Sequence, residues 1–167
     1  MHIRKASLKD SKDIVRLYKA VAEIEGGLIR TSEEITLNYV QSFVTNSIDN
    51  GIILVIENPE DKNELIAEMH ASKPGIKVLN HILFNLSIVV HPDWQGKGVG
   101  RKIFSHFLEM VSSMPTITRV ELIARESNTK AIQFYQSLGF KIEGKFENRI
   151  RTLSGALVSD VPMAWTR

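Results

Sequence analysis

The sequence predicts an α+β protein with a mixed, mostly antiparallel central sheet flanked by helices. Two observations lead to this prediction: apolar residues recur at helical spacing in several segments, and runs suited to β-strands lie between those segments. With 167 residues the chain has the length of one ordinary domain, and it shows no internal repeat, low-complexity tract or linker. We therefore expect residues 1–167 to form a single domain.

Two helices are expected in the first third of the chain. Ser7 suits the N-cap of the first helix, and glycines at 26–27 interrupt it. Its apolar stripe consists of Ile14, Leu17, Tyr18, Val21 and Ile24. The second helix is expected to begin at Thr31 or Ser32 and to run through Phe43, because the acidic residues that follow suit a first helical turn.

Two more helices are expected further along. One begins after a glycine-rich loop near Val99 and ends before Pro115, which cannot continue a helix. The other is capped by Asn128 and ends before Gly139, which suits a left-handed residue.

Strands are expected over residues 2–6, 51–57, 65–72, 81–90, 119–124, 140–150 and 157–165. The short connections between 51 and 90 favour antiparallel neighbours there, and a bend at Ser154-Gly155 favours a hairpin near the end of the chain.

Composition excludes several classes of function. The formal net charge of +2 and the sequence pI of about 8.9 are too mild to indicate a nucleic-acid partner. Cysteine is absent, so disulfides, thiolate metal sites and a cysteine nucleophile are excluded, and we expect no metal. The first residues lack the apolar run of a signal peptide, and no stretch is long enough to span a bilayer. We expect a cytoplasmic protein without a membrane partner.

The stretch Gln95-Gly96-Lys97-Gly98-Val99-Gly100 follows an apolar strand and opens a helix. Free backbone N–H groups at a helix start, together with the positive end of the helix dipole, bind phosphate oxygens. Glycines let an anion approach those N–H groups. Because Arg101 and Lys102 add positive charge to that of Lys97, the pattern predicts a site for a phosphate-bearing ligand.

The residues of this loop do not match two other phosphate-binding motifs. A P-loop requires a Gly-Lys pair followed by Ser or Thr, which is missing here. The dinucleotide fingerprint requires its third glycine three positions after the second, whereas Gly98 and Gly100 are two apart. The remaining alternative is a turn that only lets the strand and the helix pack.

At these residues the chain resembles the GNAT superfamily of acyl-CoA-dependent N-acyltransferases, whose signature is Gln/Arg-x-x-Gly-x-Gly/Ala. Gln95, Gly98 and Gly100 match that signature. A second block resembles the family's next motif: Val120-Glu121-Leu122, Asn128, Ala131-Ile132, Tyr135 and Leu138-Gly139-Phe140. The resemblance is good over 86–144 and implies a GNAT-like sheet with a splayed strand pair at the CoA site. It also implies acetyl-CoA as co-substrate.

The resemblance assigns roles to residues of this sequence. The residues that it places at the cofactor are Ile88, Val89, Val90, Gln95, Gly96, Lys97, Gly98, Val99, Gly100, Arg101, Asn128 and Tyr135. The strand residues would hold the pantetheine arm and the loop the pyrophosphate. Tyr135 is the expected acid that protonates the departing sulfur, and a strand N–H near Val90 is the expected donor to the oxyanion.

The general base is not identified by the resemblance. The usual carboxylate positions, in the stretch 81–85 and at Ile123, hold no acidic residue. Glu121 shares the strand face of Ile123 but is more typical of a solvated residue. Further candidates are His81, His91, Glu68 and His70.

The missing carboxylate bears on the acceptor amine. At pH 7, deprotonating an amine of pKa about 10.4 costs about 4.6 kcal/mol, and deprotonating one of pKa about 8 costs only about 1.4 kcal/mol. The missing carboxylate therefore favours an α-amine or another weakly basic acceptor.

The sequence therefore predicts transfer of an acetyl group from acetyl-CoA to a primary amine of a small molecule, such as an amino acid, by direct attack in a ternary complex. The resemblance to bacterial small-amine acetyltransferases supports this prediction, and family members often form homodimers. Two alternatives stay open: a protein N-terminal or lysine acetyltransferase, and a catalytically silent acyl-CoA-binding module.

Overall fold

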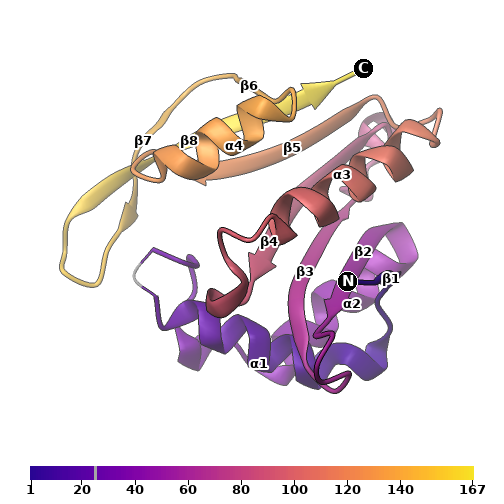
Figure 1. The fold of residues 1–167 in the computed structure, drawn as a ribbon. Helices are drawn as coiled ribbons and strands as arrows, with labels where there is room; N and C mark the ends of the chain where they lie inside the picture. Colours follow the sequence, from indigo (N-terminus) through magenta and orange to yellow (C-terminus); the bar gives the residue numbers. More distant parts are fainter. Residues whose placement is uncertain (25) are drawn as a thin grey trace. The chain divides into compact units, whose positions relative to one another are not determined.

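The computed structural model of the chain describes residues 1–24 and 26–167. These residues form a mixed sheet of eight strands with helices beside it, which confirms the predicted fold class (Figure 1). The chain divides into two compact units, which we describe in turn. The first holds residues 1–72 and 87–114, and the second holds 73–86 and 115–167. That the whole chain is one domain stays a prediction.

The strands of the first unit are β1 (Ile3–Lys5), β2 (Gly51–Glu57), β3 (Leu65–Ser72) and the end of β4 (Ile82–Val90), in that order across the sheet. β1 is antiparallel to β2, and β2 is antiparallel to β3. Every residue of β3 is buried. β3 is therefore covered on both of its faces.

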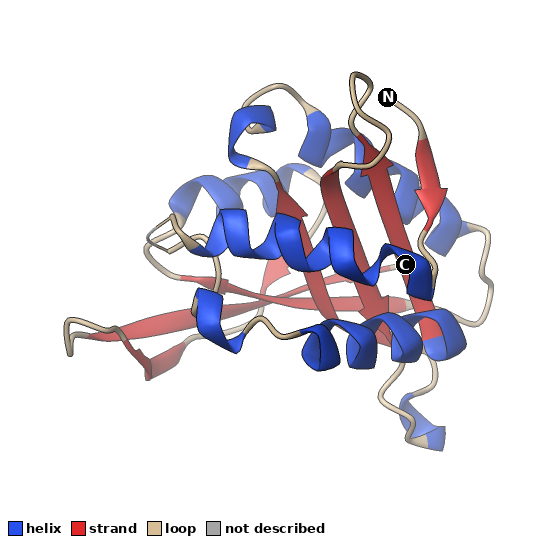
Figure 2. Ribbon diagram, turned by 90° about the horizontal axis from the view of Figure 1, so that it is seen from below, coloured by secondary structure: helices blue, strands red, loops and turns tan. Residues whose placement is uncertain are grey.

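Helices supply that cover: α1 (Ser11–Ala22), α2 (Leu37–Asn50) and α3 (Val99–Ser112), drawn blue beside the red strands in Figure 2. Ile53 and Val55 of β2 join the apolar cluster formed by α1 and α2. Ile52 and Leu54 point to the opposite face because strand side chains alternate. They are also buried, and α3 contacts β2 and β3. The first two helices thus cover one face and α3 covers the other.

Two helix starts differ from the sequence prediction. Ser7 caps a short 3-10 turn, and α1 begins only at Ser11. The second helix begins at Leu37, because the Thr36 hydroxyl accepts a hydrogen bond from the Tyr39 N–H at 3.1 Å and so supplies the cap. The segment Ser32–Glu34 is a separate 3-10 turn. Ile24, predicted on the first apolar stripe, lies beyond the end of α1 and is exposed.

The second unit holds the start of β4, β5 (Arg119–Arg125), β8 (Leu157–Thr166) and β6 (Lys141–Ile142) in that order. β4 and β5 are parallel, with Ile82 paired to Arg119 and Leu83 to Val120. Asn85, two residues after Leu83, has a φ of 52°, which breaks the regular strand backbone. The paired residues of β4 and β5 thus lie at the start of both strands, as expected of a splayed pair.

β8 pairs antiparallel with β5, β6 and β7 (Phe146–Arg151). The single strand predicted over 140–150 is therefore two strands. The left-handed backbone at Asn148, with a φ of 52°, accounts for the register shift within β7. The predicted bend at Ser154-Gly155 does join β7 to β8, and Gly155 has a φ of 88°.

α4 (Thr129–Ser137) completes the second unit. Its N-cap is Asn128, as predicted, and its side chain accepts a hydrogen bond from the Ala131 N–H at 3.1 Å. Gly139, with a φ of 93°, occupies the left-handed position after the helix.

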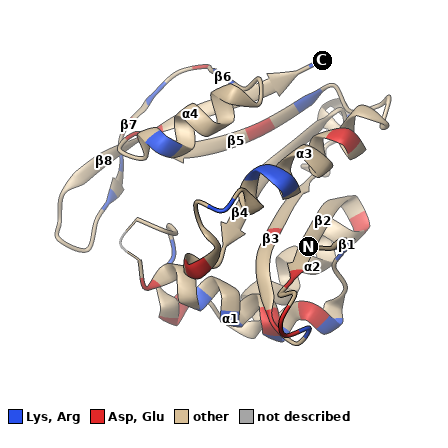
Figure 3. Cartoon of the chain, in the orientation of Figure 1, with Lys and Arg blue, Asp and Glu red and all other residues tan. Residues whose placement is uncertain are grey.

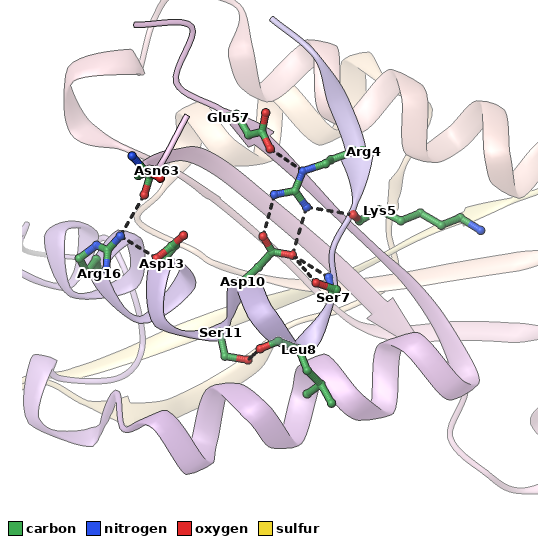
Figure 4. A network of polar contacts seen from close by, with 10 residues as sticks. All are labelled: Arg4, Lys5, Ser7, Leu8, Asp10, Ser11, Asp13, Arg16, Glu57 and Asn63. Carbon is green, nitrogen blue, oxygen red and sulfur yellow. Dashed lines mark hydrogen bonds and ion pairs between the residues drawn. The ribbon is translucent and has the colours of Figure 1, made fainter. Parts of the chain in front are cut away.

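A network of charged groups joins β1 to the turn before α1 (Figure 4). The Arg4 guanidinium donates to Asp10 at 2.7 Å and to Glu57 of β2 at 2.6 Å. The Ser7 N–H donates to the same Asp10 carboxylate at 2.7 Å. Burial opposes the charge on Asp10, but these hydrogen bonds outweigh it and lower the pKa of the carboxyl. The ionised form of Asp10 therefore stabilises the fold.

We expect Asp10→Asn to lower the free energy of unfolding by about 1–3 kcal/mol at pH 7, because a buried charged hydrogen-bond acceptor is lost. A depressed carboxyl pKa stabilises the fold above its unfolded value, about 3.9, and this contribution disappears as the pH falls through the lower folded value. The difference from wild type should therefore shrink below about pH 4. Urea unfolding at pH 7 and pH 3 measures it.

The matched control is Asp13→Asn, since Asp13 pairs with the exposed Arg16 on the surface of α1. It should change stability by less than about 0.5 kcal/mol. Equal stabilities of wild type and Asp10→Asn at pH 7 would contradict the assignment.

Candidate active site

The turn from β4 into α3 is fastened at several points in the first unit. The His91 N–H donates to the Ile66 carbonyl of β3 at 2.9 Å, and the Trp94 N–H donates to the His91 carbonyl at 2.8 Å. The Gln95 side chain then reaches back and donates to the Val90 carbonyl at 3.1 Å. Gln95 thus anchors the loop to the strand, which is a role that the sequence did not suggest.

The glycines after Gln95 set the direction of the backbone. Gly96 and Gly98 have φ values of 72° and 79°, and Gly98 is the N-cap of α3. The Lys102 N–H donates to the Gly98 carbonyl at 3.0 Å. Within the described part of the chain, no hydrogen bond is made by the N–H groups of residues 96–100. Five consecutive exposed or helix-terminal amides are therefore open to an acceptor.

Positive charge surrounds this helix start. In Figure 3 the ribbon at the beginning of α3 is blue, the colour of Lys and Arg. The Lys97 ammonium lies 5.2 Å from the centre of the Trp94 ring. The Lys102 ammonium donates to the Met1 carbonyl at 2.9 Å. Arg101 is the third cation, in the first turn of α3. Amides, helix dipole and cations all favour an anionic group here.

The end of β4 presents two faces. The Val89 side chain is buried in the cluster under α1 and α2, whereas Ile88 and Val90 lie near Gly100. A Cβ on Gly100 would meet Val90 at 3.7 Å and Ile88 at 3.9 Å. The Val99 side chain is also buried. Of the residues predicted to bind cofactor, Val89 and Val99 can therefore contribute only backbone groups.

The first unit brings together ten of the residues predicted at the cofactor: Ile88, Val89, Val90, Gln95, Gly96, Lys97, Gly98, Val99, Gly100 and Arg101. The other two, Asn128 and Tyr135, lie in the second unit. Because Asn128 is the cap of α4 and not part of the helix, its carbonyl oxygen binds the Ala131 N–H and its amide NH₂ is the group left to bind a ligand.

Tyr135 is half-buried on α4, with Phe134 and Phe140 as aromatic neighbours. Burial raises the pKa of Tyr135 to about 12. The phenol is therefore fully protonated at neutral pH. Full proton transfer to a thiolate whose acid has a pKa of about 8.5 would cost about 5 kcal/mol, so Tyr135 is better suited to donate a hydrogen bond to developing charge on sulfur.

The base candidates separate clearly in the structure. His81 is exposed, and the half-buried His91 accepts a hydrogen bond from the Asp93 N–H at 3.3 Å within its own turn. Glu121 is ion-paired to Arg119 at 2.6 Å. Glu68 and His70, in contrast, are both buried and lie 3.0 Å apart, from Glu68 Oε1 to His70 Nδ1.

Glu68 and His70 belong to a larger polar cluster with Tyr18 of α1 and Ser87 of β4, here called the Glu68 cluster. The Tyr18 hydroxyl donates to Glu68 Oε2 at 2.6 Å and lies 3.4 Å from the Ser87 hydroxyl. Burial and then the charge on Glu68 raise the pKa of Tyr18 well above its usual value. Sequence reasoning missed Tyr18, which it placed on an apolar stripe, and Ser87.

Among the described residues there is no group of three or more His, Cys, Asp or Glu side chains that could hold a metal ion. Nor does any helix that they form have the length and apolar character needed to cross a bilayer.

Comparison with known proteins identifies the family. The model of the acetyltransferase (GNAT) domain matches residues 49–142, more than half of the chain. The chain belongs to the GNAT acetyltransferase family. The matched range includes the loop of residues 95–100 and α4, so both blocks that carried the resemblance lie within the GNAT match.

Two curated relatives illustrate the range of GNAT proteins that are similar to this chain. Spermidine N(1)-acetyltransferase of Escherichia coli K12 is 26% identical over 91 residues, which are 52% of this chain and 49% of that protein. The [ribosomal protein bS18]-alanine N-acetyltransferase of Salmonella typhimurium LT2 is 34% identical over 85 residues, 49% of this chain and 55% of that protein. The chain thus matches about half the length of these relatives.

Solved structures share the whole fold. The yncA protein of Salmonella typhimurium, whose structure contains its cofactor acetyl-CoA, superimposes with a TM-score of 0.81 at 18% identity and covers 99% of this chain and 93% of that one. The GNAT fold therefore extends over both units, each taken by itself, although the sequences have diverged.

The left-handed glycines of this GNAT loop generate a prediction about stability. Gly98→Ala should lower the free energy of unfolding by about 1–2 kcal/mol, because a Cβ is disfavoured at a positive φ. Space is not the reason, since nothing lies within 4 Å of the added Cβ. Chemical unfolding at neutral pH measures the effect.

Gly100→Ala is the matched control, because Gly100 has an ordinary helical backbone and its added Cβ makes only normal contacts. It should be neutral or stabilising by up to about 1 kcal/mol. Equal effects of the two substitutions would show that backbone conformation does not shape this turn.

Proposed function

We propose that this chain binds acetyl-CoA and transfers its acetyl group to a primary amine of a small molecule, such as an amino acid, in a ternary complex. The observation that carries the proposal is the row of open amides at residues 96–100, at the start of α3 and next to the end of β4. An anion as large as a pyrophosphate suits several amides, a helix dipole and adjacent cations at once.

Acetyl-CoA supplies a thioester carbonyl that a neutral amine attacks, with coenzyme A thiolate as the leaving group. In this proposal the amides of residues 96–100 hold the pyrophosphate, and Lys97 and Arg101 balance its charge. The backbone of residues 88–90 positions the pantetheine arm, and an N–H near Val90 stabilises the oxyanion. Two groups of the second unit also have proposed roles. The Asn128 amide binds the cofactor, and the Tyr135 phenol donates a hydrogen bond to the departing sulfur.

The acceptor is proposed to be an amine of low pKa. Neither usual carboxylate position is acidic, and Ile123 is half exposed on its strand. A relative named for spermidine and one named for an alanine of a ribosomal protein support an amine acceptor in general. Because the relative named for a protein alanine is the more similar of the two, the second candidate is acetylation of a protein α-amine.

The test of this function has a binding step and a turnover step. Calorimetry with acetyl-CoA should show binding to the wild type, weakened about tenfold in Lys97→Glu by charge repulsion near the helix start, equivalent to about 1.4 kcal/mol. Lys19→Glu, a change of the same size on the exposed face of α1, should bind as the wild type does.

Turnover is followed by release of the coenzyme A thiol across a panel of amines at pH 7. Amino acids and other α-amines should react faster than isolated lysine-like amines, since the cost of deprotonation differs by about 3 kcal/mol. Preference for peptides with a free N-terminus over free amino acids would favour the second candidate. Absence of binding, or binding without any turnover, would overturn the proposal.

The role of Tyr135 gives a separate prediction. Tyr135→Phe removes only the hydroxyl, so kcat should fall by about 10²-fold, as for loss of a proton or hydrogen-bond donor, while the affinity for acetyl-CoA changes little. Phe134→Leu is the control, because Phe134 neighbours Tyr135 on α4 but carries no donor. An unchanged kcat in Tyr135→Phe would remove the residue from the mechanism.

A further inference from the structure

A buried carboxylate and a buried histidine stand out on β3, a strand in which every residue is buried. Glu68 is fully buried and His70 is 7% exposed. Burying a carboxylate costs several kcal/mol unless it is well paired, and volume-matched apolar residues in such places are often as stable. Stability alone therefore gives no reason for these two residues at the centre of β3.

The hydrogen bonds of the Glu68 cluster fix which nitrogen of His70 carries a proton. Ionised Glu68 only accepts hydrogen bonds: one from Tyr18 at 2.6 Å and one from His70 Nδ1 at 3.0 Å. With Nδ1 protonated, neutral His70 keeps the lone pair on Nε2. No described residue hydrogen-bonds to that atom. Carboxylate and imidazole are thus arranged as a base and its orienting group.

The groups that face this pair are few. α1 contributes Tyr18, and α2 contributes Phe43, whose ring stacks on His70 with centres 4.3 Å apart. Ile53 and Val55 lie directly opposite His70 and Glu68 on β2. β4 contributes the Ser87 hydroxyl. The ring of Tyr39 packs against Phe43, and Tyr39 makes the smallest contribution to the raised pKa of Tyr18. Glu68 is therefore the one charged partner of His70 among the described residues.

The cluster reaches the strand that the proposed function assigns to the cofactor. Ser87, half-buried on β4, comes directly before Ile88 in the chain. An aromatic series leads outward from His70 through Phe43 to the half-buried Tyr39, over which the exposed Arg30 lies at 4.2 Å. Within the first unit, His70 thus has β4 on one side and, on the other, the aromatic series that ends at the half-buried Tyr39.

We infer that His70, oriented by Glu68, is the proton acceptor for the acceptor amine, acting through an intervening water. The inference rests on the proposed function. The N–H bond of the bound ammonium breaks, its electron pair stays on nitrogen for attack on the thioester, and the proton passes through water to Nε2. The resulting imidazolium is stabilised by Glu68 and returns the proton to solvent. Glu68 and Tyr18 are positioning residues.

The pH dependence of turnover tests this inference. Because Nε2 must be unprotonated, wild-type kcat should fall on the acidic side of the pH profile, and we call this fall the acidic limb. His70→Gln should lower kcat about 10²- to 10⁴-fold and abolish this acidic limb, with the Kd for acetyl-CoA within about twofold of wild type. His106→Gln changes a partly exposed histidine on α3, and it should keep both kcat and the acidic limb.

The pH dependence of kcat in Tyr18→Phe tests whether Tyr18 acts through Glu68, because a purely structural role would leave that pH dependence unchanged. Removing the hydroxyl takes one donor from Glu68, so the carboxylate interacts more strongly with protonated His70. The acidic limb should therefore move to higher pH, by about half a unit or more, while acetyl-CoA binding persists.

A measurement without variants keeps the inference testable if His70→Gln does not fold. The pKa of His70, followed by NMR of ¹⁵N-labelled wild type with coenzyme A bound, should match the kinetic limb. A mismatch of more than about one unit, or an intact limb in His70→Gln, overturns this inference while leaving the proposed function standing. Wild type that neither binds acetyl-CoA nor releases thiol overturns both.

Discussion

The left-handed backbone at Gly96 and Gly98 is the constraint on which the candidate site depends. This conformation turns the chain out of β4 and into α3 within a few residues, and it leaves a row of amides without partners in the described structure. Residues with a Cβ disfavour it. Gln95 holds the turn to the carbonyl of Val90, so strand end and helix start behave as one piece. A ligand bound by the amides is thereby held in a fixed relation to the last residues of β4.

Packing of α3 gives those amides their direction. Ile103, Phe104 and Phe107 are fully buried, and α3 contacts β2 and β3. The helix dipole is therefore fixed by core contacts on one face of the sheet, while the Glu68 cluster lies on the opposite face under α1 and α2. Side chains of β4 lie on both faces of the sheet. Ile88 and Val90 lie near Gly100 of α3, and the Ser87 hydroxyl lies near the Tyr18 hydroxyl of α1. Alternation along one strand would thus place the proposed anion site and the proposed proton acceptor on opposite faces of the sheet.

Residue spacing within each segment predicted most of the helices and strands. It could not predict which side chains of different segments contact one another. Apolar spacing located the four helices, and the glycines located the loop. Helix starts were less certain because Ser and Thr are frequent: Thr36, rather than Thr31, supplies the cap of α2. The Glu68 cluster joins residues up to 69 positions apart, and spacing carries no such information. The one available signal was that Glu68 and His70 lie on the same face of a mostly apolar strand.

In the proposed reaction, the protons lost by the acceptor amine include the one that coenzyme A gains when it leaves. An ammonium acceptor loses two protons on the way to an amide: one before attack and one as the amide forms, and coenzyme A needs one of them because its thiol has a pKa of about 8.5. A histidine suits the first transfer because it titrates near neutrality and can return its proton to water. Tyr135, whose pKa is raised to about 12, loses its own proton too reluctantly to store charge. It therefore suits a hydrogen bond to the sulfur, in which the phenol keeps its own proton while the second proton released by the amine accounts for the thiol.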